Sequence, residues 1–408
     1  DLKTGELKIL AKWHDFFSSP VISPDGLRMA FMTWDHPNMP WDESTIWVTE
    51  LDEAGMPGEM IPVAGGKQGE QKISVQQPQF AATGELFYIS DESGYWNLYR
   101  EKSGQSVCPR EAEFGGPHWV FGMHHYEFLD SGKIICCYSE KNLDQLALLD
   151  PETDELEDLD LPYTSIGNLS LSGNRLLTVA SSPTLFPEII EIELSTKIVK
   201  TIKTSTDLEL DQAYLSVPET IEFPTAGNAV SHGFYYPPTN QDFQGLDGET
   251  PPLIVMLHGG PTSATHAVLS FKTQYWTTRG FGVLDLNYRG STGYGRAYQD
   301  ELIRQWGIID VEDAVAGAEY LVRQQKADPQ RLAIRGGSAG GYTTLAALTF
   351  ADTFKAGASL YGISDLEILA RETHKFESRY LDQLIGDLSL IHISEPTRRR
   401  GISYDVYS

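Results

Sequence analysis

The chain has 408 residues, 41% of them hydrophobic, and carries a formal net charge of −26 at pH 7. This length favours two or more domains, and this hydrophobic content excludes global disorder. A protein this acidic is not expected to bind nucleic acid through its overall electrostatic field. No apolar run is long enough to span a membrane, and no signal peptide is visible at the first residue. We therefore expect a cytoplasmic protein without a membrane partner.

The chain contains three cysteines, Cys108, Cys136 and Cys137. An odd number with two adjacent members argues against a disulfide framework. The sequence begins without methionine in a hydrophilic segment, so we expect that its natural N-terminus is missing. We expect no cofactor and no metal site, and the sequence leaves a homo-oligomeric state open.

The N-terminal half repeats one pattern, in which a turn, an apolar strand, a polar tip and a second strand follow one another. The apolar strands that open the repeats lie at 27–32, 86–90, 134–138 and 175–180. Their spacing falls near the ~40–50 residues of a propeller blade. We therefore predict a partial β-propeller of about four blades over residues 1–213, with further blades missing. A sandwich of short strands is the alternative.

After residue 213 the pattern changes from strand pairs to alternating strands and helices. The run Leu253-Ile254-Val255-Met256-Leu257 is continuously apolar, as in buried parallel strands. Between 312 and 325, apolar residues recur at helical spacing. The expected strands lie at 219–223, 232–236, 253–257, 282–287, 331–335 and 356–361. This alternation predicts a doubly wound, mostly parallel sheet over residues 214–387.

Six residues, Gly336-Gly337-Ser338-Ala339-Gly340-Gly341, lie between a short apolar strand and a helix-like segment. A serine at the apex of such a strand–turn–helix is typical of the nucleophile elbow of α/β-hydrolases, in which glycines permit the tight turn and the serine hydroxyl is pushed out over the edge of the sheet. We therefore predict Ser338 as a nucleophile on an α/β-hydrolase domain. A glycine-rich turn without chemistry is the alternative.

Several segments around the elbow resemble the prolyl oligopeptidase family of serine peptidases, in particular its acylaminoacyl-peptidase and dipeptidyl-aminopeptidase-like branch. The matching segments are 258–261, 287–295, 306–307, the elbow with Gly341 and Tyr342, 361–365 and 376–380. The resemblance is strong from about 214 to 387, and the N-terminal repeats resemble that family's propeller more by architecture than by motif. It implies a serine peptidase whose propeller restricts access to short peptides.

Acyl transfer from an amide needs an oxyanion hole beside the nucleophile. The elbow turns the backbone N–H of Ala339 into the site. By resemblance, the second donor is the N–H of Gly260, in the loop after the strand at 253–257. Some relatives place a tyrosine hydroxyl in this loop, where this sequence has His258. The hydrolase order is serine, acid, histidine, so we interpret His258 as an oxyanion-loop residue and not as the base.

No credible catalytic acid or base follows Ser338. The later histidines are His374 and His392, and Asp365 fits better as a helix cap. Family members continue into strands that carry the acid and the base, whereas residues 388–398 here resemble a translated transposase-type sequencing adapter. We therefore predict a non-native tail at 388–408, a truncated hydrolase domain and a chain that is inactive as written. A divergent final strand is the alternative.

The substrate pocket is predicted from four residues near the elbow. Ile363, Leu366 and Leu369 follow the strand after the elbow, where relatives line the pocket for the residue before the scissile bond, and Tyr342 adjoins the elbow. Ordinary helix packing is the alternative for these residues.

Taken together, the sequence predicts a serine-type peptidase that forms an acyl-enzyme on Ser338 and has a short peptide as its partner. A carboxylesterase or lipase on the same fold and a non-catalytic propeller binding module are the alternatives. The propeller disfavours the esterase, because most esterases carry helical lids instead. The residue preference, and the choice between exo- and endo-cleavage, stay open.

Overall fold

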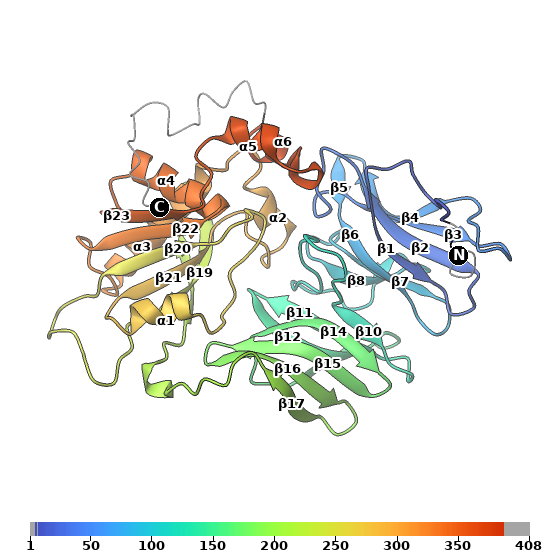
Figure 1. The fold of residues 1–408 in the computed structure, drawn as a ribbon, viewed down its shortest axis with the longest axis horizontal. Helices are drawn as coiled ribbons and strands as arrows, with labels where there is room; N and C mark the ends of the chain where they lie inside the picture. Colours follow the sequence, from blue (N-terminus) through green and yellow to red (C-terminus); the bar gives the residue numbers. More distant parts are fainter. Residues whose placement is uncertain (1–4, 6, 387–408) are drawn as a thin grey trace.

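The structure is a computed structural model that describes residue 5 and residues 7–386 (Figure 1). Its N-terminal part forms four antiparallel sheets whose strands follow one another along the chain. In chain order, the four sheets contain β1 (Phe16–Ile22), β2 (Arg28–Trp34), β3 (Thr45–Glu50), β4 (Ile61–Gln68) and β5 (Gln71–Ile73); β6 (Val75–Phe80), β7 (Leu86–Ser90), β8 (Asn97–Arg100) and β9 (Gln105–Ser106); β10 (Tyr126–Phe128), β11 (Ile134–Glu140), β12 (Leu143–Asp150) and β13 (Glu155–Leu159); β14 (Ser165–Ser172), β15 (Arg175–Ser182), β16 (Leu185–Glu193) and β17 (Ile198–Thr204).

The four sheets have the build of propeller blades. The turn between the first two strands of each contains a glycine at positive φ, namely Gly26 (77°), Gly84 (83°), Gly132 (86°) and Gly173 (58°). Glycine adopts this left-handed conformation at no steric cost, which is why these turns were visible in the sequence. Neighbouring sheets pack face to face, because side chains of the first and second sheets share one buried cluster and those of the third and fourth share another.

The C-terminal part contains a six-stranded sheet of order β18-β19-β21-β20-β22-β23. β18 and β19 form an antiparallel hairpin, β19 runs antiparallel to β21, and the pairs β21–β20, β20–β22 and β22–β23 are parallel. Its strands are β18 (Glu219–Pro224), β19 (Val230–Tyr236), β20 (Leu253–Leu257), β21 (Gly282–Asn287), β22 (Leu332–Gly337) and β23 (Ala356–Leu360), and its helices are α1 (Phe271–Thr277), α2 (Arg296–Asp300), α3 (Ile309–Arg323), α4 (Ala339–Phe350), α5 (Leu366–Glu372) and α6 (Tyr380–Leu384). The strands and the helix expected from the sequence are confirmed.

Helices cover both faces of this sheet. Along β20, Leu253, Val255 and Leu257 belong to the cluster that contains α3 and α4 side chains, whereas Ile254 and Met256 belong to a second cluster against which Trp276 of α1 packs. Successive side chains of a strand point to opposite faces, so a strand buried on both faces is apolar throughout. The sheet is therefore doubly wound, as predicted.

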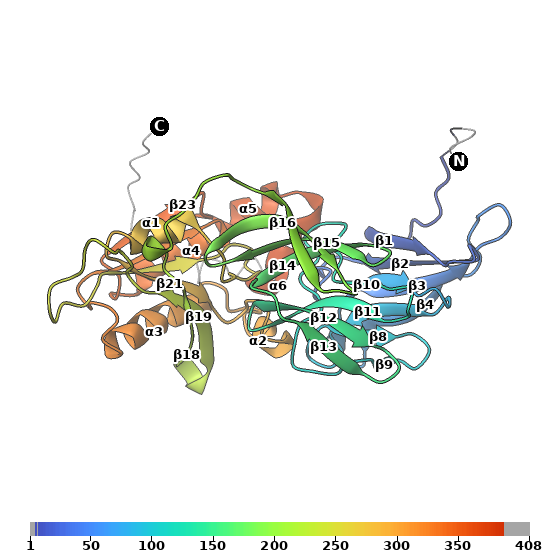
Figure 2. The same cartoon turned by 90° about the horizontal axis from the view of Figure 1, so that it is seen from below.

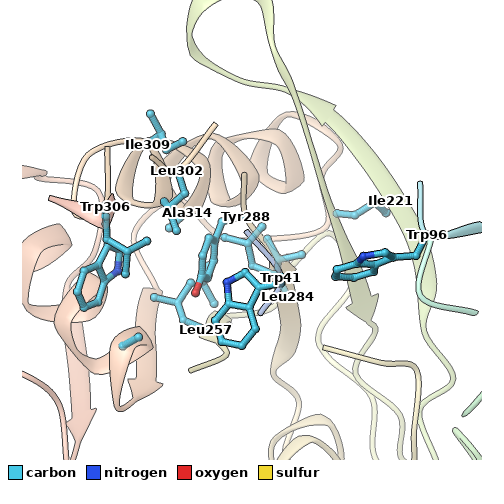
Figure 3. Packing of buried hydrophobic residues seen from close by; sticks show 14 of the residues in the cluster. Trp41, Trp96, Ile221, Leu257, Leu284, Tyr288, Leu302, Trp306, Ile309 and Ala314 are labelled. Atoms are coloured by element: carbon cyan, nitrogen blue, oxygen red, sulfur yellow. The ribbon is translucent and has the colours of Figure 1, made fainter. Parts of the chain in front are cut away.

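The two parts of the molecule share a core. Figures 1 and 2 show the parallel sheet and its helices at one end of the long axis and the first two propeller sheets at the other. Trp41 and Trp96, from the first two sheets and their loops, lie in the same buried cluster as Leu257 and Leu284 of the parallel sheet (Figure 3). The hydrolase-type sheet and the propeller-type sheets are thus packed against each other through apolar side chains.

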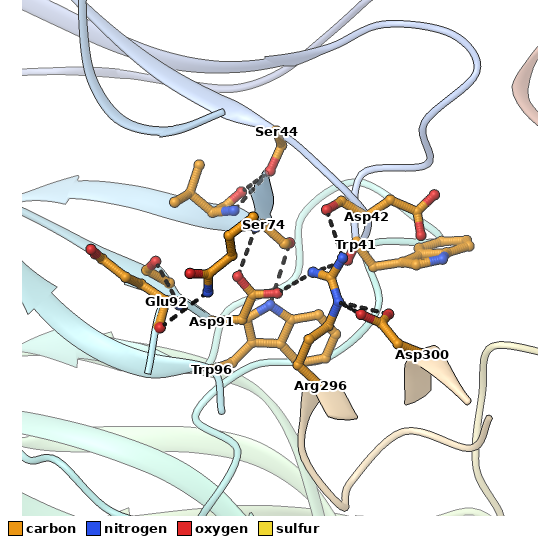
Figure 4. A network of polar contacts seen from close by, with 12 residues as sticks. Trp41, Asp42, Ser44, Ser74, Asp91, Glu92, Trp96, Arg296 and Asp300 are labelled. Carbon is orange, nitrogen blue, oxygen red and sulfur yellow. Dashed lines mark hydrogen bonds and ion pairs between the residues drawn. The ribbon is translucent and has the colours of Figure 1, made fainter. Parts of the chain in front are cut away.

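A buried ionic network crosses the same boundary (Figure 4). Arg296, at the start of α2, contacts the Asp91 carboxylate over 2.6 Å and donates to the Asp42 carbonyl over 3.0 Å, and both partners are in the propeller. It also pairs with Asp300 over 2.8 Å. Burial raises the pKa of Asp91 to about 6 although Arg296 acts in the opposite direction.

The predicted C-terminal tail and the predicted domain boundary are not tested by the structure. The predicted tail at 388–408 and His392 lie outside the described residues. No helix within residue 5 and residues 7–386 is long and apolar enough to cross a membrane. The division of the chain near residue 213 stays a prediction; β17 ends at Thr204 and β18 begins at Glu219.

Candidate active site

Ser338 occupies a strained junction between β22 and α4. It is the residue between Gly337, the last of the strand, and Ala339, the first of the helix, and its backbone has φ 53° and ψ −122°. Positive φ in a residue with a Cβ typically costs about 1–3 kcal/mol and is concentrated at functional sites. Its N–H donates to the carbonyl of Leu360 on β23 over 3.1 Å, which fixes the turn against the neighbouring strand.

The glycines of the elbow are required by close backbone contacts. A Cβ on Gly336 would lie 2.3 Å from the carbonyl oxygen of Gly340, and a Cβ on Gly340 would lie 2.6 Å from the carbonyl oxygen of His258. A Cβ on Gly341 would lie 2.5 Å from the Cα of Gly362. The strand, the helix and the loop after β20 therefore approach one another too closely for any side chain, as the sequence pattern indicated.

Of the two predicted oxyanion donors, Ala339 adjoins Ser338 and Gly260 lies in a loop that approaches it. Ala339 begins α4, so its N–H belongs to the first turn, where helix N–H groups have no partner inside the helix. The loop after β20 approaches from the other side, since a Cβ on Gly259 would lie 3.5 Å from the Ser338 Cβ and 4.0 Å from its Oγ. Gly260, next in this loop, has φ 118°. No acceptor within residues 7–386 is recorded for the N–H of Ala339 or of Gly260.

The His258 side chain is held in the loop by residues other than Ser338. Its Nδ1 lies 2.7 Å from the carbonyl oxygen of Gly259, and its Nε2 lies 2.7 Å from the hydroxyl of Ser291. The ring stacks on Tyr288 with 4.4 Å between centroids. Burial lowers the pKa of His258 to about 4. A neutral ring therefore donates from Nδ1 and accepts from Ser291 at Nε2, which agrees with a structural role in the oxyanion loop.

The same loop is held from two further directions. Trp119, in the propeller, donates its indole N–H to the carbonyl of Thr262 over 2.8 Å. Tyr380, at the start of α6, accepts from the Thr262 N–H over 3.0 Å and donates to its hydroxyl over 2.7 Å. Sequence reasoning missed Trp119, Ser291 and Tyr380 as site residues. Their only sequence signal is that Ser291 and Tyr380 fall in segments that resemble the peptidase family.

Comparison with known proteins identifies the relatives of this site. The sequence profile of the prolyl oligopeptidase family matches residues 267–395, which include the elbow. An acylamino-acid-releasing enzyme from Arabidopsis thaliana is 27% identical over 326 residues, which make up 71% of this chain and 42% of that protein. The C. elegans dipeptidyl peptidase family member 6 is 41% identical over 118 residues, or 28% of this chain and 16% of that protein.

Solved structures extend the likeness to the propeller. A puromycin hydrolase is 38% identical with a TM-score of 0.89, and the match covers 95% of this chain and 59% of that chain. A puromycin-hydrolysing peptidase from Mycobacterium tuberculosis is 40% identical with a TM-score of 0.91, over 96% of this chain and 60% of that chain. The chain resembles the prolyl oligopeptidase family, as predicted. Its resemblance to the acylaminoacyl-peptidase and dipeptidyl-aminopeptidase-like branch is likewise confirmed. The chain spans at most 60% of the length of these relatives.

The predicted pocket residues lie in or near the core. Leu366 and Tyr342 are buried, and the Tyr342 ring packs on Trp306 with 4.7 Å between centroids. Ile363 and Leu369 are partly buried and pack against the same cluster. Their assignment to the substrate pocket stays a prediction, and the packing interpretation accounts for the burial of Leu366.

Among residues 7–386, the two candidates for a catalytic acid and base, Asp365 and His374, have partners other than Ser338. Asp365 caps α5, because its carboxylate accepts from the N–H groups of Glu367 and Ile368. His374, the histidine that follows Ser338 within the described residues, has a side chain that is 68% exposed and lies 3.7 Å from Glu377. Neither side chain forms a hydrogen bond or an ion pair with Ser338 among the described residues.

Proposed function

We propose that the protein is a serine peptidase that hydrolyses short peptides through an acyl-enzyme on Ser338. The observation that carries this proposal is the strained backbone of Ser338, φ 53°, between the N–H of Ala339 at the start of α4 and the loop that approaches its hydroxyl from β20. Such a site combines an exposed nucleophile with donors on two sides, which is the arrangement that acyl transfer needs.

The residues present support the first half of the reaction. The Ser338 hydroxyl attacks the carbonyl carbon of the scissile bond, and its proton passes to a base while the carbonyl oxygen becomes an oxyanion. The N–H groups of Ala339 and Gly260 donate to this oxyanion. Removal of one such donor typically slows the reaction by about 10²–10³. The leaving amine then takes up the proton, and water releases the acyl group from Ser338.

We further propose that the catalytic acid and base are supplied from outside the described residues. Within residues 7–386, Asp365 and His374 are the candidates by chain order, and one caps a helix while the other is exposed. The 408-residue chain as written is therefore expected to hydrolyse peptides very slowly, because loss of a triad member removes most of the catalysis.

The substrate class follows from the relatives and from the propeller. Two relatives are named for hydrolysis of puromycin, which joins an amino acid to an aminonucleoside through an amide. The propeller contacts the loop that carries Gly260 through the hydrogen bond from Trp119 to Thr262, and we infer that it restricts the access of folded proteins to the serine. We therefore propose short peptides and related aminoacyl amides as substrates.

The test compares the protein encoded by the natural gene with its Ser338→Ala variant. We expect hydrolysis of an aminoacyl-nitroanilide and of puromycin, and a loss of at least about a thousandfold in the variant. A fluorophosphonate should label the natural protein at Ser338. Turnover of a nitrophenyl ester alone would contradict the peptidase and favour the esterase, and absence of labelling would favour the non-catalytic binding module.

A further inference from the structure

Thr262 is a buried residue whose three polar groups all bond to side chains from outside its own loop. Its N–H donates to the hydroxyl of Tyr380 over 3.0 Å, and its own hydroxyl accepts from Tyr380 over 2.7 Å. Its carbonyl accepts from the indole N–H of Trp119 over 2.8 Å. Thr262 is only 4% exposed, so water does not replace these partners. The residue is therefore fixed in position by both domains.

The chain between Gly260 and Thr262 forms a tight turn. The N–H of Ser263 donates to the carbonyl of Pro261 over 2.9 Å, and a Cβ on Gly260 would lie 2.9 Å from the nitrogen of Thr262. Peptide planarity and the proline ring leave few free dihedrals between Gly260 and Thr262. A displacement of Thr262 is therefore passed on to Gly260 and changes the direction of its N–H.

Tyr380 is held in place by aromatic side chains of the propeller. Its ring packs edge-on against Trp41, with 5.7 Å between centroids, and against Trp119, with 5.8 Å between centroids. All three side chains contribute to the same part of the molecule, in which Tyr380 is buried. Close packing leaves a buried ring little freedom to move. The position of the Tyr380 hydroxyl is therefore set by the propeller as well as by α6.

Gln383, three residues further along α6, connects this helix to the same part of the propeller. Its Nε2 donates to the Asp42 carboxylate over 2.9 Å and to the side-chain oxygen of Asn38 over 3.3 Å. Its carbonyl accepts from the N–H of Arg304 over 2.9 Å, which fixes α6 to the hydrolase-type domain. Residues three apart on a helix lie on one side of it. Gln383 and Tyr380 therefore join both domains through one side of α6.

We propose that Tyr380 is a positioning residue of the oxyanion hole, because it fixes Thr262 and thereby the turn that carries the Gly260 N–H. The Tyr380 ring and Gln383 both contact the propeller, so this positioning depends on the docking of the propeller. The hydroxyl of Tyr380 is engaged with Thr262 and acts through it. The role in an oxyanion hole rests on the proposed function, whereas the effect on the turn does not.

A role of Tyr380 in core packing alone is the alternative. Tyr380→Phe separates the two roles, since phenylalanine keeps the ring between Trp41 and Trp119 but loses the hydroxyl. Tyr235→Phe is the matched control, because Tyr235 on β19 is also buried and donates its hydroxyl to the carbonyl of Lys326 over 3.1 Å. Both variants lose hydrogen bonds to the backbone, so a general effect of such a loss appears in both.

The first measurement is amide hydrogen exchange at Ser263 in the 408-residue chain. This N–H donates to Pro261 within the turn, so its exchange reports on the turn itself. We expect exchange to become about two- to tenfold faster in Tyr380→Phe and to be unchanged in Tyr235→Phe. Unchanged exchange in Tyr380→Phe would overturn the proposal. Gln383→Leu should also accelerate exchange at Ser263, and unchanged exchange there would overturn the dependence on the propeller.

The second measurement is hydrolysis of an aminoacyl-nitroanilide by the protein encoded by the natural gene. We expect Tyr380→Phe to lower kcat by about 10- to 100-fold and to leave KM within about twofold, because the displaced N–H is needed mainly in the transition state. Tyr235→Phe should change neither constant. Loss of the accepting hydroxyl in Thr262→Val should also lower kcat, and Thr262→Ser, which keeps this hydroxyl, should lower it less. An effect on KM alone would contradict the positioning role.

The two proposals can fail separately. If the natural protein neither hydrolyses the nitroanilide nor reacts with a fluorophosphonate, the peptidase function is wrong, and exchange at Ser263 still decides whether Tyr380 fixes the turn. If the natural protein is active and Tyr380→Phe has the kcat of the parent, the peptidase function stands and the positioning role is wrong. The comparison of Thr262→Val with Thr262→Ser decides the matter if Tyr380→Phe does not fold.

Discussion

Trp119 of the propeller donates its indole N–H to the carbonyl of Thr262, two residues after Gly260 in the oxyanion loop, over 2.8 Å. The two residues are 143 positions apart in the sequence. The hydrogen bond joins the propeller directly to the loop that is proposed to hold the oxyanion. The position of that loop therefore depends on the packing of the two domains as well as on the hydrolase-type fold.

Replacement of Trp119 by Phe should loosen this loop without unfolding the protein. The variant keeps an aromatic ring but loses one hydrogen bond, whose net contribution is about 0.5–1.5 kcal/mol. We expect amide hydrogen exchange to become about two- to tenfold faster at Thr262 and Ser263. Trp47→Phe is the matched control, because Trp47 donates to Thr33 over 2.9 Å within the first propeller sheet. Equal acceleration by the control would contradict a local effect.

Replacement of Gly340 by Ala should destabilise the elbow. The added Cβ would lie 2.6 Å from the carbonyl oxygen of His258 and 2.7 Å from that of Leu257, and backbone atoms cannot move aside cheaply. We expect a loss of about 1–3 kcal/mol in the free energy of unfolding, measured by urea denaturation. Gly167→Ala is the control, since a Cβ there meets nothing within 4 Å. A neutral Gly340→Ala variant would show that the junction is less crowded than described.

Local features of the fold were predictable from the sequence, because their causes are local. The propeller turns need glycines at positive φ, such as Gly84, and the elbow needs glycines where strand and helix approach. The strand at 253–257 is apolar at every position because the sheet is covered on both faces. Patterns of this kind lie within a few residues of one another and can be recognised without knowledge of tertiary structure.

Contacts between the domains could not be predicted in the same way. Glu113 accepts from the N–H of Gly295, which is 182 positions away, and no local sequence pattern predicts this contact. The pocket prediction shows the same limit: Leu366 is fully buried, and only the three-dimensional packing distinguishes a core leucine from a pocket leucine. The role of Ser338 as nucleophile and of Ala339 and Gly260 as donors stays a prediction that labelling can test.

The titration of Glu113 should make stability depend on pH. Burial raises its pKa from the ordinary 4.5 of a glutamate to about 7, so the folded state binds the proton more tightly than the unfolded state. The stability from this group is complete below about pH 4.5 and is lost as the pH rises through about 7, by an amount on the order of 3 kcal/mol.

Comparison with Glu113→Gln isolates this effect. Glutamine does not titrate, and the cost of its poorer acceptance from Trp96 and Gly295 is independent of pH. The variant should therefore gain stability relative to the parent chain between pH 5 and pH 8, as measured by urea denaturation at the two values. An unchanged difference between the two proteins at the two pH values would show that Glu113 has an ordinary pKa.

Arg296 should be the most sensitive ionic residue at the domain boundary, because its loss leaves the buried Asp91 carboxylate without its cationic partner, with the hydrogen bond from the Ser74 N–H remaining. Its guanidinium contacts Asp91 over 2.6 Å, and the Asp91 side chain is only 4% exposed. We expect Arg296→Met to lower the free energy of unfolding by about 3–5 kcal/mol, whereas the double variant with Asp91→Asn should recover part of the loss because the buried charge is gone.

Arg331→Met is the control for this prediction. Arg331 is 41% exposed and pairs with Asp328 and Glu249 at the surface, so its removal should change the urea midpoint little. If the double variant is no more stable than Arg296→Met alone, the loss comes from the packing of the arginine stem and its other partners and not from the unpaired Asp91.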